Sequence, residues 1–240
     1  MKRYLFLLLA LLSMVTVSAQ DNLAQSSTVV SEPIKLWTSN FHSLVVDANI
    51  KLVLVALPDD QAPYIIYDTK GVETSNFIAD VDREGVLHIS EKVVAKRVEK
   101  TEVELYYHNL DNITISRADV RFEGLFEGKI VDIDISNKAT LSADVDLLDL
   151  KIRVSGDSRV ELSGKVLYHD AEVSAAKYDA QELSSMAAIV LADRNAEVWV
   201  DAVQRLEAKS GNAGKIYYKQ QPEIYRMERR FLGVDAVELK

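Results

Sequence analysis

The residues with the clearest chemical potential in this sequence are two pairs of aspartates. Asp132 and Asp134 lie two positions apart, and so do Asp144 and Asp146. Alternate residues share one face of a β-strand and lie about 7 Å apart, because each residue advances the strand by about 3.3 Å. Inverting glycoside hydrolases hold their two carboxylates at a similar separation. A polysaccharide-active enzyme with paired aspartates is therefore one hypothesis for this chain.

Other catalytic and metal-binding residue types are absent or scattered. The chain contains no cysteine, which excludes disulfides, thiolate zinc sites and cysteine nucleophiles. The four histidines lack the paired spacing of a zinc motif, and no phosphate loop or nucleophile elbow is complete. These histidines are His42, His88, His108 and His169. We predict no catalytic residue, no metal site and no cofactor, and favour a charged, solvated surface for the aspartates.

Aromatic residues are the second candidate for function. Adjacent tyrosines occur twice, and an alternating strand must point one member of each pair outward. One tryptophan lies between two valines, which favours an outward indole. Exposed aromatic rings can stack on sugars or contact a protein, although a C-terminal segment over residues 225–239 could instead cover them. The possible ligand contacts are Tyr106, Trp199, Tyr217 and Tyr218.

Composition indicates an ordinary globular protein. The chain has 240 residues, 48% of them hydrophobic and 27% charged, with a net charge of −9. That length can bury a substantial core without metal or disulfide bridges. The acidic balance argues against nucleic acid, which requires a clustered basic face.

The first nineteen residues resemble a secretory signal peptide. Lys2 and Arg3 precede an apolar run over residues 4–12, and Val17-Ser18-Ala19 supplies the small residues of a cleavage site. The apolar run is short for a membrane span, so an uncleaved anchor is the less favoured alternative. We expect a periplasmic, secreted or cell-surface protein, cleaved near Ala19, with no membrane span in the mature chain. Residues 20–40 are polar and predict a flexible lead-in.

From residue 41 onward a period of two dominates and predicts an all-β chain. Five segments in the second half share an alternating strand followed by small or polar turn residues. Ser136, Ser155 and Ser174 are spaced by 19 positions. A fixed period with two strands per unit predicts a stacked β-solenoid, because one unit cannot cover its own apolar face. A β-meander sandwich is the alternative.

The charges agree with an in-register stack. Stacking would place Asp132, Lys151 and Asp170 in one outward column, and Asp134, Arg153 and Glu172 in the next. Both columns alternate in sign, and opposite charges across neighbouring strands stabilise the pair by about 0.2–1 kcal/mol. The expected inward columns are Ile133–Ile152–Ala171 and Ile135–Val154–Val173.

Turn residues and the C-terminus complete this prediction. Asn137, Gly156-Asp157, Asn195 and Gly211–Gly214 are residues that tolerate a tight corner, so we expect valine at Gly156 or Gly211 to destabilise the fold. We expect one domain over residues 41–240, with an irregular β portion over 41–110, repeated rungs over 111–222 and a C-terminal cap over 223–240. A solenoid needs such a cap to protect its last rung.

The chain resembles the putative auto-transporter adhesin head GIN domain family. The residues that carry the resemblance are a Phe41-x-x-Leu-x-Val opening, the turn Val154-Ser155-Gly156-Asp157-Ser158, and Lys209-Ser210-Gly211-Asn212. Ser174-Ala175 and Asp193-Arg194 replace the family's usual Ser-Gly. The resemblance covers about residues 41–240 and implies an exported right-handed β-helix-like solenoid with a less regular N-terminal β portion and no established catalytic residues.

These observations favour a non-enzymatic binding or scaffolding protein of the cell envelope, with a possible part in adhesion. Its partner would be an envelope protein or a glycan of unknown identity. The alternatives are the polysaccharide-active enzyme with paired aspartates and a purely structural envelope protein that self-associates.

The signal-peptide prediction has a direct test. Exported material should begin at Gln20, because the cleavage site follows Ala19. N-terminal sequencing of the secreted or periplasmic fraction measures this, and a chain that still begins at Met1 contradicts cleavage.

Overall fold

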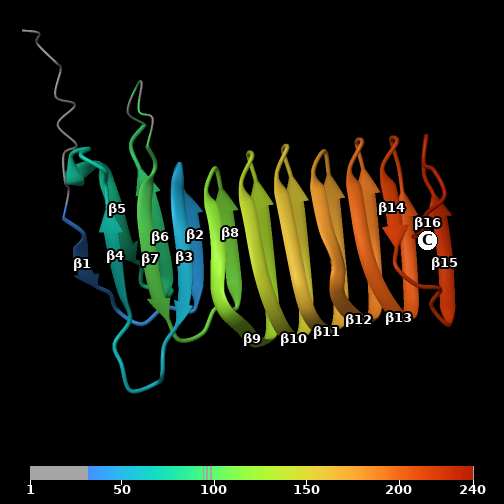
Figure 1. Cartoon of the computed structure of the whole chain (residues 1–240), viewed down its shortest axis with the longest axis horizontal. Helices are drawn as coiled ribbons and strands as arrows, with labels where there is room; N and C mark the ends of the chain where they lie inside the picture. Colours follow the sequence, from blue (N-terminus) through green and yellow to red (C-terminus); the bar gives the residue numbers. More distant parts are fainter. Residues whose placement is uncertain (1–31, 94, 96, 98, 240) are drawn as a thin grey trace, which may run out of the picture.

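The computed structural model describes residues 32–93, 95, 97 and 99–239 (Figure 1). The predicted signal peptide and the first part of the lead-in lie outside these residues. The described chain is almost entirely β-structure and winds into a β-solenoid of about seven turns, as the alternating pattern predicts. Its sixteen strands and one 3-10 turn have the following bounds: β1 Ile34–Trp37, β2 Ser43–Asp47, β3 Ile50–Ala56, β4 Tyr64–Asp68, η1 Thr74–Asn76, β5 Phe77–Val81, β6 Val86–Glu91, β7 Thr101–Tyr107, β8 Asn112–Ser116, β9 Asp119–Ser136, β10 Thr140–Ser155, β11 Arg159–Ser174, β12 Lys177–Asp193, β13 Glu197–Ser210, β14 Lys215–Tyr218, β15 Ile224–Arg229 and β16 Val237–Glu238.

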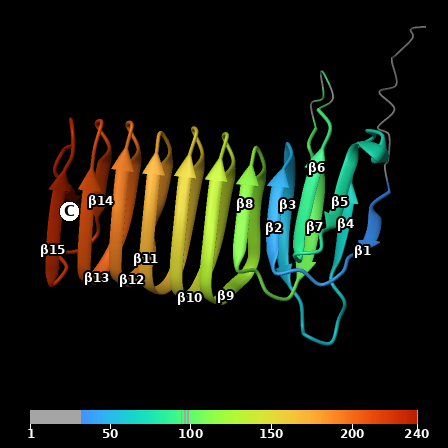
Figure 2. The same cartoon turned by 180° about the vertical axis from the view of Figure 1, so that it is seen from behind.

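The long strands β9 to β13 each form one rung of the stack. Each strand runs along one face, bends, and returns along the opposite face, as Figures 1 and 2 show from the two sides. Neighbouring rungs pair in parallel along both halves, which excludes an antiparallel sandwich. We call the face with the first halves of these strands face 1. Face 1 continues through β3, β7 and β4 at one end and β14 at the other; face 2 holds the second halves with β8, β2, β6, β5 and β15.

The predicted charge and core columns are confirmed by the register. Lys151 pairs with Asp132 on one side and Asp170 on the other, and Arg153 pairs with Asp134 and Glu172. The inward residues of these rungs are almost completely buried between the two faces. They form the columns Ile133–Ile152–Ala171 and Ile135–Val154–Val173. The core is therefore a series of apolar columns that run along the stack.

The N-terminal part is less regular, as predicted, because its order in space differs from its order in the chain. The β2–β3 rung lies between β8–β9 on one side and β6–β7 on the other. Strands β1, β4 and β5 then pair antiparallel at the outer end. Beside them, Arg97 contacts Glu91 at 2.7 Å, and the two side chains are only 12% and 4% exposed. This ion pair, which is shielded from solvent, holds the β6–β7 connection against the end of β6.

Left-handed backbone at one edge of the stack lets the chain turn on every rung. Asn137 and Lys138, Gly156 and Asp157, and Arg194 and Asn195 have positive φ. Two successive residues of positive φ are typical of the tight type I′ turn. The turns also bond to each other: the Lys138 amide donates to the Gly156 carbonyl at 2.8 Å. The turn edge is thus a hydrogen-bonded ladder of its own.

Gly211 departs from the expectation for this edge. Its φ is not left-handed, and the left-handed residues of that turn are Asn212 and Ala213. An added Cβ at Gly211 would meet side-chain atoms of Asp193 and Arg230, which can move. At Gly156, φ is +66°, and an added Cβ would lie 3.0 Å from the backbone nitrogen of Asn137. The two glycines therefore have different structural roles.

We predict that Gly156→Ala lowers the free energy of unfolding by roughly 1–3 kcal/mol, because it forces a β-carbon into a strained conformation beside a fixed backbone. Gly211→Ala is the matched control and should cost less. Chemical denaturation of both variants measures the difference. Equal losses in the two variants would contradict the assignment of the left-handed positions.

A histidine and a tyrosine meet inside the apolar core. His169 Nε2 and the Tyr178 hydroxyl oxygen are 2.6 Å apart. The other ring nitrogen of His169, Nδ1, is buried without a hydrogen-bond partner. Burial lowers the pKa of His169 from 6.5 to about 4. The folded protein thus holds this imidazole neutral, since a second N–H would have no acceptor.

The His169 pair predicts acid sensitivity. Because the pKa of His169 is lower in the folded than in the unfolded chain, the unfolded chain takes up a proton first as the pH falls. The free energy of unfolding therefore has its full value above about pH 6.5 and decreases towards pH 4, by roughly 1.4 kcal/mol per pH unit. His169→Gln keeps a hydrogen-bonding group without titrating there, so this part of the pH slope should disappear. Denaturation between pH 4 and 7 measures it. The control His108→Gln, at a partly buried histidine outside the core, should retain the slope, and an unchanged slope in His169→Gln would refute the prediction.

Candidate binding surface

The aspartates of the repeat lie on opposite faces of the solenoid. Asp134 on face 2 accepts two hydrogen bonds from Arg153, at 2.5 and 2.8 Å. Lys151 is the register neighbour of Asp132, so a cation lies opposite each member of this pair. The Asp134 contact raises the pKa of the Arg153 guanidinium, chiefly through the hydrogen bond. This arrangement matches the charged, solvated ladder favoured from the sequence.

Asp144 lies on face 1, in a shallow groove of about 520 Å³. It accepts a hydrogen bond from the Ser163 hydroxyl at 3.2 Å. The groove contains three further carboxylates, from Glu161, Asp179 and Glu182. No group of three or more histidine or acidic side chains in the described ranges has an arrangement that could hold a metal ion. The groove is thus an acidic depression on the sheet.

The register slips of the stack explain this depression. Pairing shifts between Ser142 and Asp144 on β10, and between Glu161 and Ser163 on β11. Gly164, beside the second slip, has φ +105°, and a β-carbon there would lie 2.1 Å from the Val145 carbonyl oxygen. An extra residue in a strand bends the chain and disrupts the ladder locally. Face 1 is hollowed where these irregularities follow one another.

Trp199 and Tyr217 form an aromatic pair on face 1, at the C-terminal end of the stack. They are register neighbours on β13 and β14, and their rings stack with centroids 5.2 Å apart. Both are half-buried. Val198 and Val200 are fully buried, so Trp199 points outward as predicted. We call these two residues the C-terminal aromatic pair.

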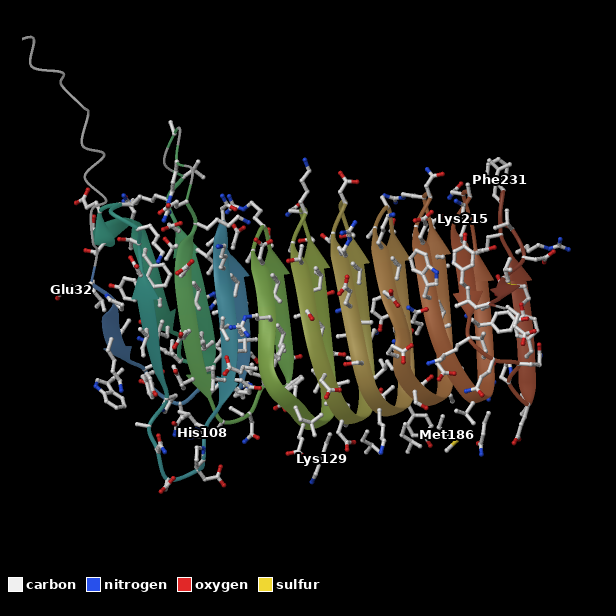
Figure 3. The ribbon with its side chains drawn as sticks, viewed as in Figure 1. Glu32, His108, Lys129, Met186, Lys215 and Phe231 are labelled. Atoms are coloured by element: carbon white, nitrogen blue, oxygen red, sulfur yellow. The ribbon has the colours of Figure 1, made fainter. Side chains whose placement is uncertain are left out.

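The surroundings of this pair are charged. Glu197 contacts Lys177 at 3.0 Å and Lys215 at 3.3 Å in the neighbouring column. Hydrogen bonds from these two lysines lower the pKa of Glu197. Asp179 is the other register neighbour of Trp199 and belongs to the acidic groove. The aromatic rings therefore adjoin both cations and carboxylates, next to the turn edge where Lys215 projects (Figure 3).

Tyr106 belongs to a second aromatic group, at the N-terminal end of face 1. Its ring stacks on Tyr64 with centroids 4.2 Å apart, and Trp37 meets the edge of Tyr64. The Lys35 ammonium lies 3.5 Å from the centre of the Tyr64 ring, which is a cation–π contact. A hydrogen bond to Glu104 raises the pKa of the Tyr106 hydroxyl to about 12. We call Trp37, Tyr64 and Tyr106 the N-terminal aromatic cluster.

The inward members of the tyrosine pairs belong to the core. Tyr218 is 8% exposed and packs against Tyr225, with ring centroids 5.5 Å apart. Tyr107 is 3% exposed. Tyr218 is thus buried, unlike the other three predicted contacts. The C-terminal segment covers Tyr218 but leaves Trp199 and Tyr217 half-exposed.

A larger groove, of about 650 Å³, lies on face 1 beside the N-terminal cluster. Ile66 and Val53 contribute apolar lining, and Lys70 binds Glu102 at 2.7 Å across it. Hydrogen bonds to Glu102 and Asp68 raise the pKa of Lys70. Sequence reasoning missed this groove and Tyr64, because β4 is an antiparallel strand at the outer end of the stack and does not belong to the repeat. The run Tyr64-Ile65-Ile66-Tyr67 consists of residue types that favour β-strands, and it was the sequence signal for β4.

The two grooves and the aromatic pair form one path across the strands. Ser142 lines both grooves, and Asp179 of the second groove is the register neighbour of Trp199. From β7 to β14 the path crosses eight adjacent strands. At about 4.8 Å per strand, it is roughly 34 Å long. We call it the face 1 groove.

Comparison with known proteins agrees with this architecture. A family model described as "putative auto-transporter adhesin, head GIN domain" matches residues 40–222. The chain belongs to this family. Since the match covers most of the chain, the resemblance noted from the sequence is confirmed. No curated protein matches the sequence.

Crystal structures of other bacterial proteins share the fold. A putative adhesin from Bacteroides fragilis superposes with a TM-score of 0.79 at 15% identity, over 86% of this chain and 95% of that one. A putative adhesin from Parabacteroides merdae gives 0.68 at 14% identity, over 87% and 96%. A protein from Parabacteroides distasonis described as a putative lipid binding protein gives 0.60 at 16% identity, over 88% and 97%. At these identities the likeness concerns the fold alone.

Proposed function

We propose that this GIN domain protein is an exported, non-catalytic binding protein of the cell envelope with an adhesion-type role. The family description and the adhesins among its structural neighbours support this role and imply an exported or surface location. None of the described segments forms a helix with the length and hydropathy that a bilayer crossing requires. We retain the proposal that residues 1–19 are cleaved and residues 41–240 act as a single domain.

The face 1 groove is the observation that carries the proposal. Its two ends hold outward aromatic rings, and its floor offers carboxylates, lysines and hydroxyls for hydrogen bonding. Aromatic rings bind the apolar faces of sugars or flat side chains, while polar groups fix orientation. A path roughly 34 Å long and open to solvent suits an extended ligand better than a small one. We propose a glycan chain or an extended segment of an envelope protein as that ligand.

The proposed contacts are Trp199 and Tyr217 at one end of the groove and Tyr106 at the other. Tyr218 would act indirectly, since it belongs to the same strand as Tyr217 but is buried and packs on Tyr225. In this role Lys177 and Lys215 hold Glu197 ionised beside the aromatic pair. The site requires no cofactor and no proton transfer.

A glycan array combined with a reducing-sugar release assay tests the proposal. We expect retention on one class of glycan without turnover, and a loss of roughly tenfold in affinity for Trp199→Ala, since stacking of one aromatic ring contributes about 0.5–1.5 kcal/mol beyond the apolar area that it buries. Tyr168→Ala is the matched control, because Tyr168 is 53% exposed but lies at the bend edge, away from the groove. It should bind normally.

The enzyme alternative has its own outcome in the same experiment. Sugar release that Asp144→Asn or Asp132→Asn abolishes would replace the binding proposal with polysaccharide hydrolysis. Binding that Trp199→Ala and Tyr168→Ala weaken equally would remove the face 1 groove as the site.

A further inference from the structure

The last strand of face 2 presents an edge that no described strand covers. Strand β15 pairs with β13 along one side, from Arg205 opposite Ile224 to Ser210 opposite Arg229. It stands at the end of the stack in both views (Figures 1 and 2). An unpaired edge offers a row of N–H and C=O groups to another strand. Residues 223–239 therefore extend the stack by part of a rung, and no described strand pairs with the outer edge of β15.

The same end leaves apolar surface uncovered. Tyr225 and Met227 pack on the core but remain half-buried, because no further rung lies over them. Ile224 is 50% exposed, and Phe231 and Leu232 are 77% and 68% exposed. Phe231 projects at the turn edge of this end (Figure 3). Stacked repeats need a polar terminal surface to stay single, and this end combines charged residues with exposed apolar ones.

The charges of β15 complement those of a second copy in one antiparallel register. Outward positions along Ile-Tyr-Arg-Met-Glu-Arg alternate with inward ones, so Arg226 and Glu228 share the outer side of the strand. A two-fold axis through Met227 places Arg226 of each copy opposite Glu228 of the other. Shifting the register by two residues in either direction brings Arg226 opposite Arg226, or Glu228 opposite Glu228. Opposite charges across strands are favourable and like charges are not, so one register is selected.

We propose that two copies of this chain join end to end through β15, in the register centred on Met227. Face 2 would continue from one copy into the next, and the half-buried Tyr225 and Met227 would be covered. Ile224 of one copy then lies near Phe231 of the other, because the two-fold axis brings the bend edge against the turn edge. The contact is isologous, so it closes after two copies and produces no filament.

The charged groups of β15 are free to make these contacts. Within one chain, Arg226 lies 3.5 Å from Glu207, and Glu228 lies 3.4 Å from Arg230. Arg230 and Glu228 are at least half exposed, and such an exposed pair contributes little to stability. Arg226 is 70% exposed, and its partner Glu207, which is 18% exposed, keeps Arg205 as a second cation when Arg226 moves. Rearranging them towards a second copy therefore costs little.

Analytical ultracentrifugation of the exported protein with charge-swap variants tests the dimer. The wild type should show a reversible monomer–dimer equilibrium with no larger species. Arg226→Glu should weaken the dimer roughly tenfold or more, because it makes both reciprocal contacts repulsive. The double variant Arg226→Glu with Glu228→Arg should restore it, because the two opposed charges are exchanged together.

The double variant separates the interface from effects inside one chain. It leaves a glutamate at 226 facing Glu207, so any loss that came from the intrachain Arg226–Glu207 pair would persist. Lys129→Glu makes the same charge change at the bend edge of β9, far from β15 (Figure 3), and should leave the dimer unchanged. Thermal melting confirms that each variant is folded. A wild type that is monomeric at all soluble concentrations, a ladder of larger species, or a failure of the double variant to restore the dimer would overturn the proposal.

Discussion

Parallel, in-register stacking of rungs is the constraint on which the rest of this structure depends. Each rung has two apolar inner surfaces and cannot bury them alone, so every inward residue lies between the same positions of its neighbours. The Ile133–Ile152–Ala171 column is a direct consequence. The constraint also acts outward, because a repeated position places identical charges side by side unless the sequence alternates them. Arg153 between Asp134 and Glu172 shows that solution.

The two faces meet this constraint differently, and the difference favours binding on face 1. The register of face 2 is uninterrupted from β9 to β12, whereas the slips at Ser142 and Glu161 fall on face 1. Each slip takes a strand out of the regular ladder and hollows the surface beside it. A flat sheet gives a ligand little to hold, whereas a shallow groove flanked by aromatic rings offers shape and stacking together. The irregularities of the repeat thus supply the candidate site.

The ends of the stack pose a separate physical problem, because in-register pairing has no natural stop. At the N-terminal end the chain reverses direction, and antiparallel β1, β4 and β5 follow the parallel rungs, with the Arg97–Glu91 pair beside them. At the C-terminal end β15 and β16 continue in parallel and leave an edge. Each end of the described stack thus has an edge strand, which runs antiparallel to its neighbour at the N-terminal end and parallel to it at the C-terminal end.

The sequence by itself determined the repeat, the all-β class, the alternating charge columns and the outward direction of Trp199. All of these follow from the period of two and the 19-residue spacing, which are local properties of the chain. Recognition of the GIN domain family followed from the same turns. The position of Tyr178 against His169 was not available locally, because that contact joins one face to the other across the core.

Only the tertiary structure decided which segments that are distant in the sequence lie next to each other. It placed β2–β3 between β6–β7 and β8–β9, brought Tyr64 onto Tyr106, and buried Tyr218 while leaving Tyr217 half-exposed. It also showed that Gly156 needs its left-handed φ and that Gly211 does not. Periodicity fixes which side of a strand a residue faces, but insertion order, register slips and open edges depend on pairing between distant segments. That pairing is set by the whole stack, so no local pattern contains it.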